Sequence, residues 1–314
     1  VQRKPISWWT RDEHWWGSKE ADSLALRGRG CDVHGSRHSR SIRSEQPRRC
    51  RVPTMRGICD DLDAETQALR EVVEGLTEDE WRLLTPADGW DTHETIIHLG
   101  MADVAASLAV LDATAFEDIK QKMLRGDGDL HSFDGVDVHA LTGVELWEWF
   151  EGERNRMTGA FRDLGPKDRI PWFGPDMSAL SFATARLMET WSHSHDVADT
   201  FGAEYPQTER LRHVAHIGIT TRGWSYANRG LELPQGPVRV ELTSPSGDLW
   251  TWGPEECEDV VIADSYQFCL VVTQRRRPQE ADLEIRGDLA AEWMEIAQAF
   301  AGPPTDAPEG RVGG

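Results

Sequence analysis

Residues 178–202 read SALSFATARLMETWSHSHDVADTFG, a run without proline that predicts a long helix ending at Gly202. Glu189 and His193 are four residues apart, so their side chains lie one above the other on one helical face. His195 lies about 200° around the helix from His193 and points elsewhere, whereas Asp196 returns to the face of His193. The stretch therefore predicts a helix that presents a carboxylate and an imidazole together.

Three more long helices are predicted on the N-terminal side of this stretch. Apolar residues recur at helical spacing over residues 58–76. Asp91 stands three residues ahead of Glu94 and is the expected cap of a helix that continues to residue 111. Thr142 is the expected cap of the next helix, which continues to residue 164. Four long helices with irregular connections predict a four-helix bundle over residues 55–205.

The pattern changes after residue 206. Residues 209–229 are expected to be helical, and the alternating VRVEL at 238–242, the turn SPSGD and the following LWTWG predict a β-hairpin. Residues 263–276 are expected to form a helix, 281–286 a strand, and 289–300 a helix capped by Asp288. The sequence thus predicts a small α+β domain over residues 206–304, followed by a disordered tail over 305–314.

The first 54 residues differ from the rest in charge. They hold twelve Lys and Arg against six Asp and Glu, a net of +6, whereas residues 55–314 carry −26. One interpretation is a basic arm that contacts RNA or an anionic surface. The alternative, which we favour, is a disordered tail or a mis-annotated extension, with translation beginning at Met55.

The whole chain carries a net charge of −20, which disfavours nucleic acid as a partner. We expect no membrane-spanning helix and no secretory signal, because no long enough apolar run is evident. The cysteines show no C-x-x-C spacing, which favours a reducing compartment and predicts a cytoplasmic protein. The five cysteines are Cys31, Cys50, Cys59, Cys257 and Cys269.

A third metal ligand could come from the predicted helix HETIIHLG. It resembles the zinc motif H-E-x-x-H, but His93 and His98 are five residues apart and diverge by about 140°, which excludes that motif. His98 lies between apolar neighbours and is expected to face inward, either as a ligand or as a core histidine. Glu94 repeats the four-residue spacing to His98 and would permit a dinuclear site, although a role at the helix N-terminus is preferred. Without a third ligand, Glu189 and His193 would form an ordinary helical pair worth about 0.2–0.5 kcal/mol.

Other chemistries lack their motifs. No G-x-S-x-G, P-loop or G-x-G-x-x-G pattern is present. Cys59 and Cys269 have no adjacent histidine, so a thiol nucleophile is not expected. The run of three arginines at residues 275–277 is expected to close a helix, where cations complement the dipole. A clamp for an anionic ligand is its alternative role.

The segments GWDTHETIIHL (residues 89–99) and ETWSHSHDV (189–197) resemble the mycothiol-dependent maleylpyruvate isomerase family, within the DinB-like metal-binding bundles. The metal ligands of that family fall on His98, Glu189 and His193. The segments FCLVVTQRR and IRGDLAAEW resemble the small sterol-carrier-like domain of one branch of the family. The resemblance covers residues 55–304.

The resemblance implies a divalent metal, usually zinc, with one position open for a thiol or water. It implies an enzyme that activates a low-molecular-weight thiol, mycothiol, for isomerisation or S-transfer on a small-molecule substrate. A non-catalytic metal-binding or sensor module and a metal-dependent hydrolase are the alternatives. The substrate and the oligomeric state are left open by the sequence.

Overall fold

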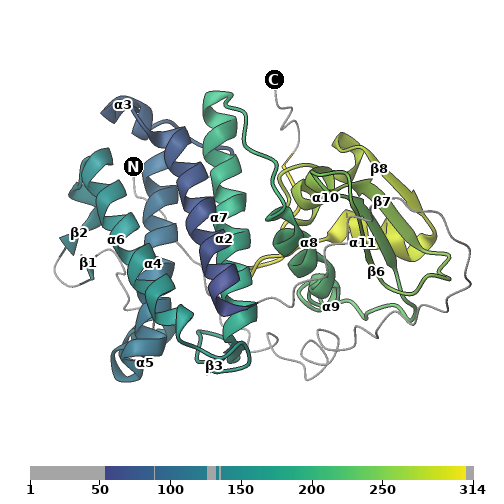
Figure 1. Ribbon diagram of the computed structural model, residues 1–314, viewed down its shortest axis with the longest axis horizontal. Coiled ribbons are helices and arrows are strands. Elements are labelled where there is room, and N and C mark those ends of the chain that lie inside the picture. Colours follow the sequence, from purple (N-terminus) through teal and green to yellow (C-terminus); the bar gives the residue numbers. More distant parts are fainter. Residues whose placement is uncertain (1–53, 88, 126–131, 134–135, 309–314) are drawn as a thin grey trace, which may run out of the picture.

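The computed structural model describes residues 54–308, except for residues 88, 126–131 and 134–135. The expectations for the N-terminal extension and for residues 309–314 lie outside these described residues. Thr305, at the start of the expected tail, is hydrogen-bonded to Gln274 and Gln298. Figure 1 shows a helical part and a sheet-containing part side by side, joined through α8 (Leu211–Thr220) and α9 (Arg222–Ala227). The predicted fold, a four-helix bundle followed by a small α+β part, is confirmed.

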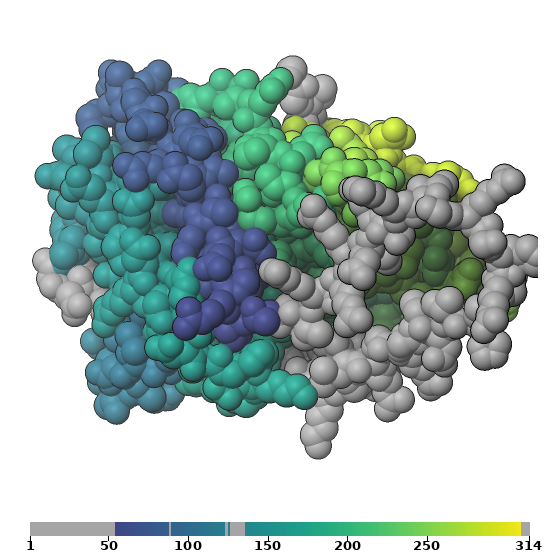
Figure 2. Space-filling view, in the orientation of Figure 1, coloured from purple at the N-terminus to yellow at the C-terminus, as the bar shows by residue number. Residues whose placement is uncertain are grey.

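The bundle consists of the four predicted helices, α2, α4, α6 and α7. Their bounds are Met55–Val73, Thr92–Leu111, Gly143–Arg162 and Ala179–Phe201. Helix α2 packs against α6 and α7, and α4 packs against the same two helices. Figure 2 shows α2, in purple, along the near face between teal α6 and green α7. This arrangement places α4 beside α7, the two helices that carry the candidate ligands.

The ends of these helices follow the predicted caps. The side chain of Asp91 accepts a hydrogen bond from the Glu94 amide at 2.7 Å and begins α4. Thr142 and Glu145 form a capping box at the start of α6. Gly202 adopts a left-handed conformation with a φ of 59° and ends α7. These local signals explain why the sequence alone places the helices well.

One buried side chain joins all four helices. Arg154 of α6 donates to Thr66 of α2 at 2.6 Å, to Asp103 of α4 at 2.6 Å and to Thr190 of α7 at 3.1 Å. Arg186 of α7 donates to the second oxygen of Asp103 at 3.1 Å. Because these side chains are buried, their hydrogen bonds fix how the helices sit against one another.

Further short elements connect the bundle helices. These are α3 (Glu78–Trp81), α5 (Ala113–Arg125), β1 (Ser132–Phe133), β2 (Val136–Asp137), the 3-10 helix η1 (Val138–Ala140), β3 (Arg169–Ile170) and β4 (Met177–Ser178). The sequence pattern does not predict α5 or the two small hairpins. Helix α4 is, within the described residues, the helix long and apolar enough to cross a membrane. However, 72% of its most apolar window is buried inside the protein, as expected for a core helix of a bundle.

The C-terminal part contains a four-stranded sheet in the order β6-β5-β7-β8. Strands β5 and β7 are parallel, and the outer strands β6 and β8 pair antiparallel with them. Its elements are α8 (Leu211–Thr220), α9 (Arg222–Ala227), β5 (Arg239–Thr243), β6 (Leu249–Trp252), β7 (Val260–Asp264), α10 (Ser265–Val272), the 3-10 helix η2 (Pro278–Glu280), β8 (Leu283–Arg286) and α11 (Asp288–Ile296). The predicted hairpin and the predicted strand at 281–286 are confirmed.

Three expectations for this part are corrected. The helix expected over 263–276 is only α10, because Asp264 ends β7 and caps the helix through the Tyr266 amide. The helix expected over 209–229 divides into α8 and α9 at Thr221. Asp288 does not cap α11, because the Leu289 and Ala290 amides in the first turn of this helix donate to the Asp259 side chain instead.

Helix α8 connects the two parts of the molecule. It packs against α7 on one side and against α10 on the other. Buried apolar side chains of all three helices, among them Trp191, Val214 and Phe268, belong to one continuous core. The C-terminal part is therefore packed directly against the helix that carries Glu189 and His193.

Candidate metal centre

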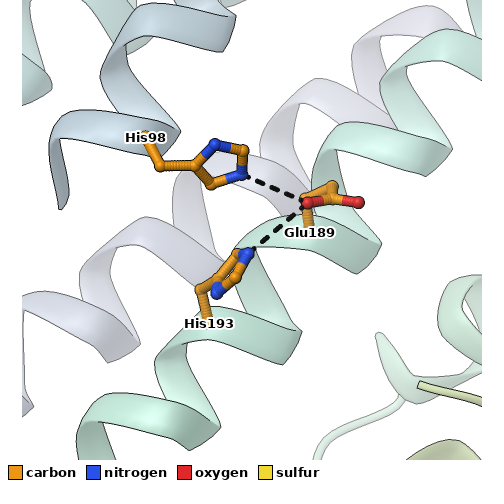
Figure 3. A group of neighbouring side chains, drawn as sticks. All are labelled: His98, Glu189 and His193. Atoms are coloured by element: carbon orange, nitrogen blue, oxygen red, sulfur yellow. Dashed lines mark hydrogen bonds and ion pairs between the residues drawn. The ribbon is translucent and has the colours of Figure 1, made fainter. Parts of the chain in front are cut away.

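The structure brings together the three side chains that the sequence selects as ligands. His98 extends from α4, and Glu189 and His193 extend from α7 toward it (Figure 3). The Glu189 Oε2 atom lies 3.4 Å from His98 Nε2 and 3.6 Å from His193 Nε2, and all three donor atoms lie within 4.8 Å of one another. Ligands of a tetrahedral zinc are separated by roughly 3.4 Å, given bonds of about 2.0–2.2 Å. The group therefore has the donor types and the spacing that a divalent metal needs.

The three side chains are mostly buried, and this sets their charge states. Burial lowers the pKa of His98 to about 4, so its imidazole is neutral near pH 7. Burial alone would raise the pKa of Glu189, but hydrogen bonds with His193 and His98 outweigh it and hold this pKa well below its usual value. A neutral imidazole and an ionised carboxylate are the forms that bind a metal.

His193 is held from behind by a second carboxylate. Its Nδ1 atom lies 3.0 Å from Asp196 Oδ2, so the opposite ring nitrogen faces Glu189. Burial acts to lower the pKa of His193, but the hydrogen bonds with Asp196 and Glu189 outweigh it and raise this pKa. The sequence placed Asp196 on the correct helical face. It did not show that Asp196 also pairs with Arg275, at 2.6 Å.

Trp90, in the loop before α4, lies against both imidazoles. Its ring centroid is 5.4 Å from that of His193, in a nearly parallel stack, and 5.1 Å from that of His98. The indole thus covers one side of the group and narrows the approach to it. This tryptophan belongs to the segment GWDTHETIIHL, which carries the resemblance to the family, but no role in the site was predicted for it.

The other candidate side chains point away from the group. His93 is fully buried, with its Nε2 atom 3.0 Å from the Leu141 carbonyl oxygen, as expected from its divergence from His98. His195 contacts the Trp191 carbonyl at 2.9 Å and the Tyr266 hydroxyl at 3.2 Å. Glu94 pairs with His139 at 3.4 Å. In the described parts of the chain, His98, Glu189 and His193 are the one group of three histidine, cysteine, aspartate or glutamate residues that lie close enough to share a metal.

The arginines at residues 275 and 276 mainly contact α7, and only one of their two expected roles is met in part. Helix α10 ends before the arginines. Arg275 pairs with Asp196, and Arg276 pairs with Asp199 at 3.1 Å. Both arginines thus pair with carboxylates of α7, and neither is left for an anionic ligand. The expected role at the helix end holds in part, because Arg275 also donates to the carbonyl of Thr273, the residue that caps the C-terminus of α10, at 2.6 Å.

Two buried cysteines, Cys59 and Cys269, are unsuited to act as thiol nucleophiles, as the sequence predicts. Burial raises the pKa of the Cys59 thiol to about 11, and it raises that of Cys269 well above its usual value. Both side chains are fully buried. Neither is therefore available as a thiolate nucleophile near neutral pH.

Comparison with known proteins identifies the family. The family model described as the mycothiol maleylpyruvate isomerase N-terminal domain matches residues 62–198, which include all three candidate ligands. Two proteins of Mycobacterium tuberculosis, the uncharacterized proteins Rv0036c (strain ATCC 25618 / H37Rv) and MT0041 (strain CDC 1551 / Oshkosh), are each 39% identical over 244 residues. Each alignment covers 78% of this chain and 95% of the relative.

Two solved structures were also found. A mycothiol-dependent maleylpyruvate isomerase matches with a TM-score of 0.44 and 16% identity, and a mutant of such an isomerase matches with a TM-score of 0.45 and 15% identity. Each match covers 71% of this chain and 90% of the solved chain. On the strength of the family model and the relatives that align over most of their length, the chain belongs to the mycothiol maleylpyruvate isomerase family.

Proposed function

We propose that this chain is a metal- and thiol-dependent enzyme of the cytoplasm. A divalent ion, zinc by the nature of the donors, is held by His98, Glu189 and His193. Mycothiol or a similar low-molecular-weight thiol is the co-substrate, and the reaction is an isomerisation or an S-transfer on a small molecule. The observation that carries the proposal is the convergence of the three donor atoms to within 4.8 Å between α4 and α7.

The donor set favours a catalytic rather than a structural site. Structural zinc sites in proteins use four protein ligands, whereas catalytic sites use three and keep one position for water or substrate. Two imidazoles and one carboxylate match the second class. A dication with one carboxylate ligand retains a net charge of +1, and it would lower the pKa of a thiol bound beside it.

The residues around the site keep its two helices in register. Arg186 donates to Asp103 at 3.1 Å and to the Leu99 carbonyl at 3.1 Å, and so links α7 to α4. Leu99 is the residue after His98, and Arg186 lies one helical turn before Glu189. This link holds the two ligand-bearing turns together, which is what a preorganised site requires. Trp90 stacks on His193 and covers the site from that side.

The thiol is supported by family membership, since the family model is named for mycothiol and maleylpyruvate. The substrate class beyond a small molecule is left open. If no thiol takes part, the same donor set would suit a hydrolase that uses bound water, or a metal sensor.

Calorimetry tests the thiol directly. We expect mycothiol to bind zinc-loaded protein and not metal-free protein. Because the thiol would bind as thiolate, it should release a proton, and the measured heat should differ between buffers of different ionisation enthalpy. Absence of binding by mycothiol and by other low-molecular-weight thiols to the zinc-loaded protein would remove the thiol from the proposal.

A further inference from the structure

Arg275 connects the C-terminal part to the candidate metal centre. It follows α10 and is 8% exposed. Its guanidinium donates to Asp196 Oδ2 at 2.6 Å, to the Ser192 carbonyl at 3.1 Å and to the Thr273 carbonyl at 2.6 Å. With all three nitrogens engaged, this side chain is fixed against α7.

Asp196 transfers this restraint to His193. Its side chain is fully buried, and the same Oδ2 atom that accepts from Arg275 lies 3.0 Å from His193 Nδ1. A carboxylate held by a guanidinium keeps its orientation, and it then fixes both the ring plane and the tautomer of the imidazole. The Nε2 atom of His193 is thereby kept toward Glu189, 3.6 Å away.

The backbone before Arg275 is strained in a way that serves this contact. Among the described residues other than glycine, a positive φ occurs at Gln274 alone, where it is 60°. Its side-chain amide donates to the Ala297 carbonyl at 3.0 Å and to the Thr305 carbonyl at 2.7 Å, which holds it there. The left-handed residue ends the helical turn and directs the next residue toward α7. Strain of this kind persists where the surrounding structure maintains it, often for function.

We infer that Arg275 and Asp196 are positioning residues for the metal ligand His193, so that the C-terminal part sets the metal affinity of the bundle. This inference rests on the proposed metal at His98, Glu189 and His193. Residues that orient a ligating histidine typically contribute about 10–100-fold to metal affinity. The sheet-containing part thus completes the metal centre without supplying a ligand.

Arg276 provides a matched control. It is adjacent to Arg275, comes from the same strained segment and also pairs with a carboxylate of α7, Asp199, at 3.1 Å. Asp199, however, has no hydrogen bond with the three candidate ligands among the described contacts. Loss of Arg276 therefore removes an ion pair between the two parts and a hydrogen bond to the Arg275 carbonyl, but it leaves the contacts of the Arg275 side chain with Asp196 and of Asp196 with His193 in place.

The test is the dissociation constant for zinc, measured on folded full-length protein by competition with a chromophoric chelator. We expect Arg275→Gln and Asp196→Asn each to weaken zinc binding by about tenfold or more. Arg276→Ala should bind like the wild type. If Arg275→Gln does not fold, Arg275→Lys should still weaken zinc binding, because lysine keeps the positive charge but lacks the planar set of donors of the guanidinium group. The visible spectrum of the cobalt-substituted protein should change in the Arg275 and Asp196 variants only.

The outcomes separate this inference from the proposed function. If the wild type binds no metal, the proposed function fails, and the inference fails with it. If the wild type binds zinc but the Arg275 and Asp196 variants bind it equally tightly, only the inference fails, even if their metal-free melting temperatures fall. The double variant that carries Arg275→Gln and Asp196→Asn should bind zinc as tightly as Asp196→Asn alone, because Arg275 acts on His193 through Asp196. Full additivity would contradict that route.

Discussion

Glu189 is the carboxylate of the candidate metal centre and contacts both imidazoles, at 3.4 and 3.6 Å. An uncharged amide is a poorer ligand for a dication than a carboxylate. We therefore predict that Glu189→Gln folds but holds zinc weakly. In a thermal melt, added zinc should raise the melting temperature of the wild type, because it binds the folded state. The same addition should have little effect on Glu189→Gln. An equal rise in both proteins would mean that Glu189 is not a ligand.

The thiols give a second test at the level of single residues. With the pKa of Cys59 raised to about 11 and that of Cys269 also raised, almost no thiolate is present at pH 8. We predict that iodoacetamide leaves both residues unmodified in the native protein and modifies them after denaturation. Cys257, which is partly exposed, is the internal control and should react in the native protein. Peptide mass mapping distinguishes these sites. Rapid native modification of Cys59 would contradict the described burial.

At the level of elements, the sequence predicts what is encoded locally. Glu189 and His193 share one helix, so their spacing alone places them together. His98 comes 91 residues before Glu189. Its position in an apolar helix left open whether it is a ligand or a core histidine, and the resemblance to a family joined it to the pair. The strand β7 was missed because its apolar run VVIA suits a buried strand and a buried helix equally. Arg275 lies 79 residues from Asp196, and no local period reveals such a contact.

Helix α6 contains a matched pair of glycines for a test of packing. A Cβ atom added to Gly143, at the start of α6, would lie 2.2 Å from the indole nitrogen of the buried Trp81. A Cβ atom at the exposed Gly152 would meet nothing within 4 Å. We predict that Gly143→Ala destabilises the protein by about 1–3 kcal/mol through overpacking. Gly152→Ala should stabilise it by up to about 1 kcal/mol, the helix propensity gain.

Chemical denaturation of the two alanine variants measures both effects. Gly143 is the first residue of α6, so its change reports mainly the contact with Trp81, whereas the change at the interior Gly152 reports helix propensity. A stability gain at Gly143 equal to that at Gly152 would show that α3 does not pack tightly against the start of α6.

At the level of the whole molecule, the buried cluster of Asp103, Arg154 and Arg186 holds the bundle together. Removing Asp103 leaves two buried guanidinium groups without their carboxylate. We predict that Asp103→Ala lowers the free energy of unfolding by about 3–5 kcal/mol. The pair of Arg70 and Glu151 also joins two helices, at 3.0 Å, but it is 42% and 37% exposed.

Glu151→Ala is therefore the control for Asp103→Ala. It should cost less than about 1 kcal/mol, because exposed ion pairs are screened by water. Urea denaturation of the two variants gives the comparison. Equal losses in the two variants would mean that burial of the Asp103 cluster adds nothing to the stability of the bundle.

The central claim is that His98, Glu189 and His193 hold one divalent metal. Its most direct test is the zinc content per chain of purified protein, measured by mass spectrometry of the element, for the wild type, His193→Ala and His195→Ala. His195 is the matched control, since it lies on the same helix and is also buried but contacts Trp191 and Tyr266. We predict about one zinc in the wild type and in His195→Ala, and none in His193→Ala. No zinc in the wild type, or equal loss from both variants, would contradict the claim.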